Sequence, residues 1–145
     1  MTAIVFVDTN VLLYAFDRAD AKKHQKAREW RAELWQRKCG RISVQVLQEF
    51  YANVVRKWPS STELARSEIR NLQAWRPVTI DIELVEHGWK IQDRYHLSFW
   101  DSLIVAAAKS SECRYLLTED LQPGQDLEGM IVIDPFQTQP SSLLS

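Results

Sequence analysis

The sequence predicts an α/β fold in which a central, mostly parallel sheet of about five strands lies between two layers of helices. Short runs rich in Val, Ile and Leu recur along the chain, and each is typical of a strand that is buried on both faces. Longer segments with apolar residues at helical spacing separate these runs. A chain of 145 residues has the size of one domain. We expect residues 1–136 to form that domain and residues 137–145 to form a loose C-terminal tail.

The expected strands are apolar, β-branched runs that end at polar or turn-forming residues. In chain order they occupy residues 3–8, 41–46, 77–81, 114–120 and 130–134. The first strand leads directly into a helix, which Thr9 or Asn10 is expected to cap. In a doubly wound sheet, the first and fourth of these strands are expected to be neighbours.

The expected helices lie between these strands and carry start and stop signals. In chain order they occupy residues 9–16, 21–37, 44–58, 60–75, 83–95 and 98–112. The apolar stripe of the second helix consists of Ala27, Trp30 and Leu34. Gly40 is expected to stop that helix. Ser60 and Glu63 fit a capping box at the start of the fourth helix, and Asp81 is expected to cap the fifth.

The composition argues against several classes of protein. No apolar segment approaches the ~18 residues that a membrane helix needs. The N-terminal apolar run has no basic segment before it, so we do not expect a signal peptide. Cys39 and Cys113 are isolated in the sequence and are expected to be buried thiols in a reducing cytoplasm. Six Trp residues indicate a large aromatic core or an apolar interface.

Positive charge is concentrated between residues 18 and 41, although the net charge of the chain is only −1. This stretch contains nine Lys or Arg residues and three acidic residues. It is a candidate surface for a polyanion, and its candidate contacts are Lys22, Lys23 and Lys26. The alternative is a solvated helix face on which Glu29 and Glu33 pair with neighbouring basic residues.

Four acidic residues are expected near the carboxyl ends of the strands, where ligands bind in parallel sheets. They are Asp8, Glu49, Asp101 and Asp120. Carboxylates that converge repel one another, and a hard divalent cation such as Mg²⁺ or Mn²⁺ relieves the repulsion because it prefers oxygen ligands. The pattern therefore favours a metal site that hydrolyses a phosphodiester. Glu49 also fits an ordinary solvated position on its helix.

The other acids have structural alternatives too. Asp8 is able to cap the first helix, although Thr9 and Asn10 offer the same function. Asp101 fits a capping box with Ser98. The acids at 119 and 120 fit an ordinary turn.

The sequence also resembles a known family. The segments VDTNVLLYAFD, SVQVLQEFY, SFWDSLIVAAA and LLTEDL resemble the four motifs of PIN domains, in the order and near the spacing of that family. The nearest resemblance is to the VapC-like toxins of type II toxin–antitoxin pairs, and it covers about residues 3–136. It implies a three-layer α/β/α fold and a cytoplasmic ribonuclease that depends on Mg²⁺ or Mn²⁺. It also implies a homodimer and a cognate antitoxin as partners.

The resemblance assigns roles to individual residues. The catalytic set is Asp8, Glu49, Asp101 and Asp120. The supporting set is Thr9, Asn10, Thr118 and Glu119. Asp8, Asp101 and Asp120 are expected to hold the metal, whereas Glu49 is expected to orient or deprotonate the attacking water. Because the fourth motif is the most variable in the family, Glu119 or Asp126 is an alternative to Asp120.

Two other functions fit parts of the pattern. Phosphatases of the haloacid-dehalogenase type also place an Asp after the first strand, but they need a second carboxylate two residues later, where this chain has Asn10. A PIN fold that only binds a protein or RNA is the other alternative, with Trp30, Trp35 and Trp58 as candidates for an apolar groove. A pure binding module has no need of clustered acids, which favours the nuclease.

Overall fold

One sheet of five strands organises the molecule, and the computed structural model describes residues 2–144. The strands are β1 (Val5–Val7), β2 (Gly40–Arg41), β3 (Tyr115–Leu117), β4 (Asp126–Leu127) and β5 (Met130–Ile133). Their order is β2-β1-β3-β5-β4, and every neighbouring pair is parallel except β4 and β5. Phe6 of β1 lies in register with Leu116 of β3, so the predicted pairing of these two strands is confirmed.

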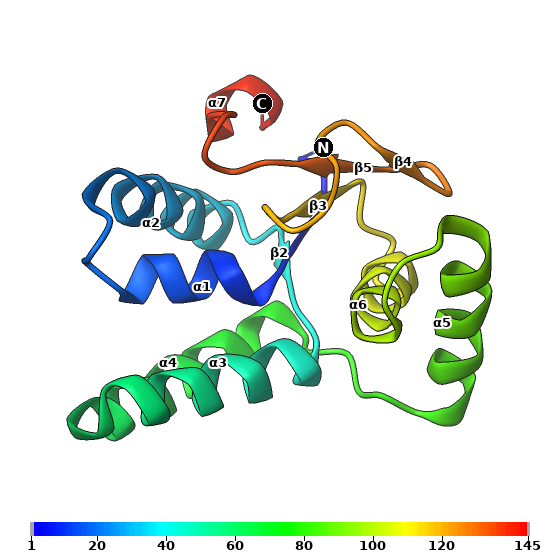
Figure 1. The fold of residues 1–145 in the computed structure, drawn as a ribbon. Helices are drawn as coiled ribbons and strands as arrows, with labels where there is room; N and C mark the ends of the chain where they lie inside the picture. Colours follow the sequence, from blue (N-terminus) through cyan, green and yellow to red (C-terminus); the bar gives the residue numbers. More distant parts are fainter. Residues whose placement is uncertain (1, 145) are drawn as a thin grey trace.

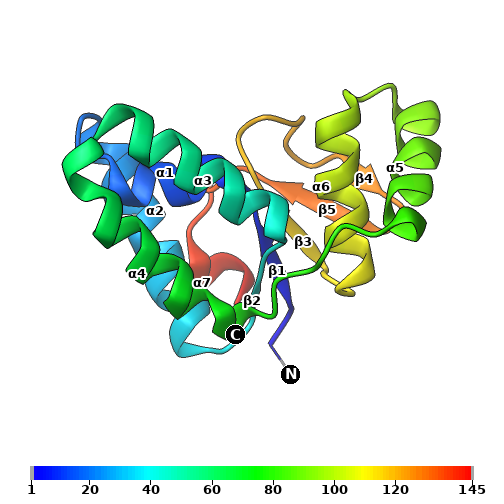
Figure 2. The same ribbon diagram turned by 90° about the horizontal axis from the view of Figure 1, so that it is seen from below.

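Helices cover both faces of the sheet. They are α1 (Thr9–Phe16), α2 (Ala21–Gln36), α3 (Val44–Lys57), α4 (Thr62–Leu72), α5 (Ile82–Tyr95), α6 (Phe99–Ser110) and α7 (Pro140–Leu143), with short 3₁₀ helices η1 (Pro59–Ser61) and η2 (Gln73–Trp75). Helices α1–α4 lie on one side of the strands, and α5 and α6 lie on the other (Figures 1 and 2). The predicted three-layer architecture is confirmed.

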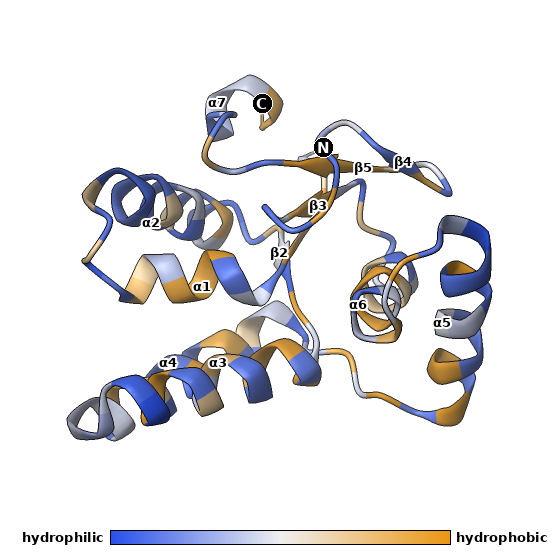
Figure 3. Cartoon of the chain, in the orientation of Figure 1, coloured by the Kyte–Doolittle hydropathy of each residue, from blue (hydrophilic) through white to orange (hydrophobic). Residues whose placement is uncertain are grey.

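Strands β1 and β3 and helix α6 form a buried part of the core. Every residue of β1 is buried, and so are Leu116 and Leu117 of β3. Helix α6 is buried from Ser102 to Ala108 because it packs against α5. Figure 3 shows the apolar strands at the centre and the polar faces of the helices outside. A packed, rigid sheet fixes the place where β1 and β3 end, and those ends carry the acidic residues considered below.

The fifth strand differs from the one that the sequence predicts. Residues 77–81 form no strand of the sheet, and only a single parallel bridge joins Ser43 to Val78. The fifth strand of the sheet is instead β4, which lies at one edge and pairs with β5 in a hairpin. Asp126 accepts a hydrogen bond from the backbone N–H of Gly129, whose φ of 93° suits a glycine. Strand β4 has only two residues, too few to show an alternating pattern of apolar and polar residues in the sequence.

The boundaries around α2 and α3 also differ from the prediction. Helix α2 ends at Gln36, and Lys38 adopts a left-handed conformation with φ of 58°. Gly40 therefore does not stop the helix; it begins β2, where a Cβ atom would approach the Trp75 indole to 2.6 Å. The predicted strand at 41–46 ends early because Ser43 caps α3 by accepting a hydrogen bond from the N–H of Val46.

The predicted capping box of Ser60 and Glu63 is wrong. Ser60 lies inside η1, which begins with Pro59, and α4 begins only at Thr62. The Glu63 carboxylate pairs with Arg66 on the same helix instead. Proline at the first position of a helix is favoured, and this preference places the helical start before the predicted cap.

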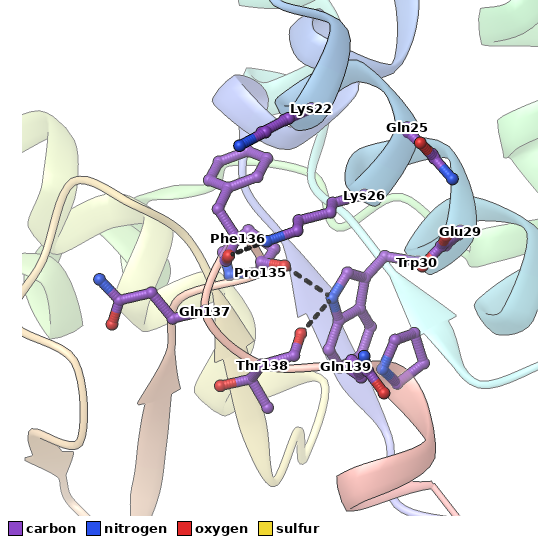
Figure 4. Close-up of a pocket in the computed structure, with 11 residues that line it drawn as sticks. Lys22, Gln25, Lys26, Glu29, Trp30, Pro135, Phe136, Gln137, Thr138 and Gln139 are labelled. Carbon is purple, nitrogen blue, oxygen red and sulfur yellow. Dashed lines mark hydrogen bonds between the residues drawn. The ribbon is translucent and has the colours of Figure 1, made fainter.

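Residues 137–144 are packed against the domain, in contrast to the loose tail expected for residues 137–145, whose last residue lies outside the described part of the chain. The Trp30 indole N–H lies within hydrogen-bond distance of the carbonyl oxygens of Pro135 and Thr138, at 3.1 and 3.0 Å (Figure 4). Leu144 is buried in the core. These contacts bind residues 135–144 to α2. Within residues 2–144, no helix combines the length and the apolar character that crossing a membrane requires.

Candidate active site at the carboxyl ends of the parallel strands

Asp8 is the most buried carboxylate of the described chain and lies directly after β1. Its side chain is only 6% exposed. Oδ1 accepts a hydrogen bond of 2.7 Å from the N–H of Thr9, so Asp8 is the N-cap of α1, and the predicted cap at Thr9 or Asn10 is wrong. Oδ2 accepts a bond of 2.8 Å from the Thr118 hydroxyl, which lies after β3. Asp8 therefore both caps α1 and lies at the carboxyl end of β1.

Burial raises the pKa of Asp8 from 3.8 to about 7, because the charged carboxylate loses its hydration when it is buried at the end of β1. The hydrogen bonds from Thr118 and Thr9 oppose this shift, and the negative charges of Asp120 and Glu49 add to it. No Lys or Arg forms an ion pair with Asp8 in the described part of the chain. A carboxylate of this kind is stabilised in its charged form when a cation binds beside it.

Asn10 joins the ends of β1 and β3. Its side-chain nitrogen lies 3.0 Å from Asp120 Oδ2, 3.1 Å from Thr118 Oγ1 and 3.4 Å from Asp8 Oδ2. Its amide oxygen accepts a bond of 3.4 Å from the N–H of Glu119. Thr118 in turn accepts a bond from the N–H of Asp120 at 3.1 Å. This network places Asp120 beside Asp8, as parallel pairing of the two strands requires.

Glu49 reaches the same place from α3. Its Oε2 lies 3.4 Å from the Thr9 hydroxyl, and its Oε1 accepts a bond of 2.9 Å from the Gln45 side chain. Its charge contributes to the raised pKa of Asp8. Gln45 was not among the residues predicted for the site. The signal in the sequence was its spacing of four residues from Glu49, which puts both side chains on one face of the helix.

Asp101 lies in the first turn of α6, on the other side of the sheet from Glu49. Its N–H donates to the Ser98 hydroxyl at 3.1 Å, and this is the predicted cap. The reciprocal bond of a capping box, from the Ser98 N–H to the Asp101 carboxylate, is not made among the described residues, but a hydrogen bond from the Ser98 side chain acts on that carboxylate and lowers its pKa. Partial burial raises the pKa of Asp101, and the charge of Asp120 raises it further.

The two alternatives for the fourth acid lie elsewhere. The Glu119 carboxylate forms an ion pair of 2.7 Å with Lys23. Asp126 forms the turn between β4 and β5. Glu119 contacts Asn10 through its backbone N–H, whereas Asp120 contacts it through its carboxylate. The network therefore brings together the carboxylates of Asp8, Asp120 and, through Thr9, Glu49.

The basic residues of α2 are partly occupied by other contacts. Lys23 binds Glu119 and lies 4.8 and 5.0 Å from the ring centres of Tyr14 and Phe136. Lys26 donates to the carbonyl oxygen of Phe136 at 2.8 Å. Lys22 lies at the rim of a hollow of about 270 Å³ between α2 and the C-terminal segment (Figure 4). The predicted pairing of Glu33 along the helix is also present, with Arg37 as its partner.

Among the described residues, the carboxylates do not form a preformed coordination site with three or more ligands. In the described residues 2–144, no group of three or more His, Cys, Asp or Glu side chains is arranged to hold an ion. Mg²⁺ requires only one or two direct carboxylates and keeps several waters. Asp8 and Asp101 fit this requirement, because neither carboxylate forms an ion pair among the described residues.

Comparisons with known proteins identify the family and the fold of the chain. The model of the PIN domain family matches residues 5–123. No curated protein matches the chain. Solved structures similar to it include FitAB bound to an IR36 DNA fragment, with a TM-score of 0.71 and 18% identity over 94% of this chain and 98% of that one.

Two further structures share the fold. A toxin–antitoxin complex from Klebsiella pneumoniae has a TM-score of 0.64 and 18% identity over 90% of this chain and 97% of that one. VapC20 from Mycobacterium tuberculosis, described as a toxin that cleaves the sarcin–ricin loop, has a TM-score of 0.61 and 23% identity over 77% of this chain and 86% of that one. The match of the family model over most of the chain, together with this shared fold, shows that the protein belongs to the PIN domain family.

Proposed function

We propose that this protein is a metal-dependent ribonuclease that hydrolyses RNA phosphodiester bonds. The observation that carries the proposal is the meeting of Asp8, Glu49 and Asp120 at the ends of β1 and β3, with Asp101 close enough for its pKa to respond to Asp120. Stability alone gives no reason to bring these acids together, since each raises the cost of ionising its neighbours.

The residues have distinct roles in this proposal. Asp8 and Asp101 hold Mg²⁺ or Mn²⁺, directly or through water, and Asp120 completes the site. When bound, such an ion lowers the pKa of a water and stabilises charge on a phosphoryl oxygen. Glu49 orients the attacking water or accepts its proton. Asn10 and Thr118 hold the carboxylates in place by hydrogen bonds.

The alternatives have less support. Position 10 carries an amide whose nitrogen faces Asp8 and Asp120, so it does not supply the acid that a haloacid-dehalogenase-type phosphatase needs. A PIN domain that only binds its partner gains nothing from a buried carboxylate with a raised pKa.

We also propose a biological setting for the nuclease. Structures of the same fold include a toxin–antitoxin complex, and the VapC20 structure is described as a toxin that cleaves the sarcin–ricin loop. By analogy of fold, this chain acts in the cytoplasm as the toxin of such a pair, forms a homodimer, and binds a cognate antitoxin protein.

The test is an incubation of the purified protein with total RNA and Mg²⁺ or Mn²⁺. An EDTA control and the Asp101→Asn variant are run beside it. Discrete fragments that require the metal and are absent with the variant support the nuclease. A well-folded protein that cuts no RNA and whose melting temperature does not respond to Mn²⁺ would contradict it.

A further inference from the structure

We propose that Gln45 is a positioning residue that holds Glu49 in its working orientation and connects it to the helix of Asp101. This inference rests on the proposed nuclease function. Gln45 lies in the first turn of α3 and is only 6% exposed. Its side-chain nitrogen lies 2.9 Å from Glu49 Oε1 and 3.3 Å from the carbonyl oxygen of Trp100.

Both partners determine how the amide of Gln45 is oriented. A carboxylate and a backbone carbonyl are acceptors only, so the atom between them must be the NH₂ group. The reversed amide would place its oxygen against two other oxygens. The contact to Glu49 is therefore a donated, charge-assisted hydrogen bond.

The bond to Trp100 connects two parts of the site. Trp100 directly precedes Asp101 in the first turn of α6, and α3 and α6 otherwise have little contact. Thr9 holds the other carboxylate oxygen of Glu49 from the α1 side. Glu49 is thus held between two donors, one of which also contacts the helix that carries Asp101.

The remaining atom of Gln45 argues against a purely structural role. Its amide oxygen is buried and has no hydrogen-bond partner among the described residues. An unpaired buried acceptor destabilises a fold, and an apolar side chain of the same shape removes that cost. A residue selected for stability alone at this position would be apolar, whereas an amide that donates to Glu49 serves the site.

The experiment compares four variants: Gln45→Met, Asn53→Ala, Glu49→Gln and the double variant of Gln45→Met with Glu49→Gln. Gln45→Met has nearly the same length and shape but no donor. Asn53→Ala is the matched control, because the Asn53 amide donates to the backbone oxygen of Glu49 and accepts from Arg56, and no hydrogen bond among the described residues joins it to the Glu49 carboxylate. For Gln45→Met we expect kcat for metal-dependent cleavage to fall about 10- to 100-fold, with KM unchanged and the melting temperature unchanged or higher. Asn53→Ala should keep the wild-type kcat. In a Glu49→Gln background, Gln45→Met should have no further effect on kcat, since it acts through Glu49.

A crystal structure of Gln45→Met tests the same idea without any activity. The Glu49 carboxylate should leave its position between residues 45 and 9 while the fold stays the same. An unchanged kcat, or a loss that adds to that of Glu49→Gln, would overturn the proposal. If the wild-type protein cuts no RNA and its melting temperature does not respond to Mn²⁺, the nuclease proposal fails by itself. The crystal structure then decides on Gln45, and an undisplaced Glu49 carboxylate overturns its role.

Discussion

Asp8 and Asp101 have the same proposed task but occupy very different surroundings. Asp8 lies at the end of a buried strand, where two donors from different segments hold its two oxygens. Asp101 lies in the first turn of a helix, half buried. Its backbone N–H donates to the Ser98 hydroxyl, and a hydrogen bond from the Ser98 side chain lowers the pKa of its carboxyl. Burial raises both pKa values, but for Asp8 the pKa reaches about 7.

If the two residues hold one metal as proposed, the site combines a fixed ligand, Asp8, with an adaptable ligand, Asp101. Burial destabilises the charged form of Asp8, so the free energy of the folded state depends on whether a cation binds beside that carboxylate. Asp101 retains contact with solvent, and the N-terminus of α6 favours its negative charge. We expect substitutions of the two residues to lower RNA cleavage equally but to change the stability of the fold unequally.

The largest effect is expected from the paired variants Asp8→Asn and Asp101→Asn. Each should lower RNA cleavage by about 10³-fold or more, because a lost metal ligand removes roughly 4 kcal/mol of transition-state stabilisation. Without metal at pH 8, Asp8→Asn should raise the melting temperature by roughly 5 °C or more, since it removes a buried charge. Asp101→Asn should change it little. Equal melting temperatures for the two variants would contradict the comparison.

The pH dependence of stability should distinguish the same two residues. The folded state binds the Asp8 proton more tightly than the unfolded state does, because the folded pKa is about 7 and the ordinary value is 3.8. Without metal, the contribution of Asp8 to the free energy of unfolding should therefore fall as the pH rises from about 4 to 7, by a total on the order of 4 kcal/mol. Urea unfolding of wild type and Asp8→Asn at several pH values measures this difference. Mn²⁺ should abolish the fall, and a wild-type profile that matches Asp8→Asn would contradict the raised pKa.

Removing the hydrogen-bond partner of each acid should sharpen the contrast. Thr118→Val removes the hydroxyl that donates to Asp8 and accepts from Asn10, so we expect cleavage to fall about 10- to 100-fold. Ser98→Ala removes the cap of α6, which should cost about 1 kcal/mol of stability and leave kcat near that of wild type. Steady-state kinetics and thermal unfolding of both variants test this pair. Two equal losses of kcat would mean that Asp101 also depends on its cap.

The smallest effects are expected on α2, away from both acids. Lys23→Ala breaks a partly exposed ion pair with Glu119 and should cost at most ~1 kcal/mol of stability. The triple variant Lys22→Ala, Lys23→Ala, Lys26→Ala should weaken RNA binding several-fold in low salt and less in high salt. Filter binding at two salt concentrations measures the effect. An affinity equal to that of wild type at low salt would remove these lysines from the RNA surface.

The sequence by itself determined the architecture and the positions of the acids. Local signals were enough, because β1 is uniformly apolar, the helices have regular apolar spacing, and Asp81 and Ser98 cap the helices that they precede. Adjacency of the strand at residues 3–8 and the strand at 114–120 followed from the rules of parallel sheets. Four motifs in the right order indicated the PIN family before any contact was known.

Only the tertiary structure decided which carboxylate of residues 119–126 contacts Asn10, which residue caps α1, and what Gln45 contacts. Each of these depends on partners that are distant in the chain, such as Lys23 for Glu119 and Thr118 for Asp8. The short strand β4 was equally invisible, since its two residues pair only because β5 lies beside them. Local sequence encodes backbone propensity and periodicity, whereas hydrogen-bond partners and desolvation are set by which segments the fold brings together.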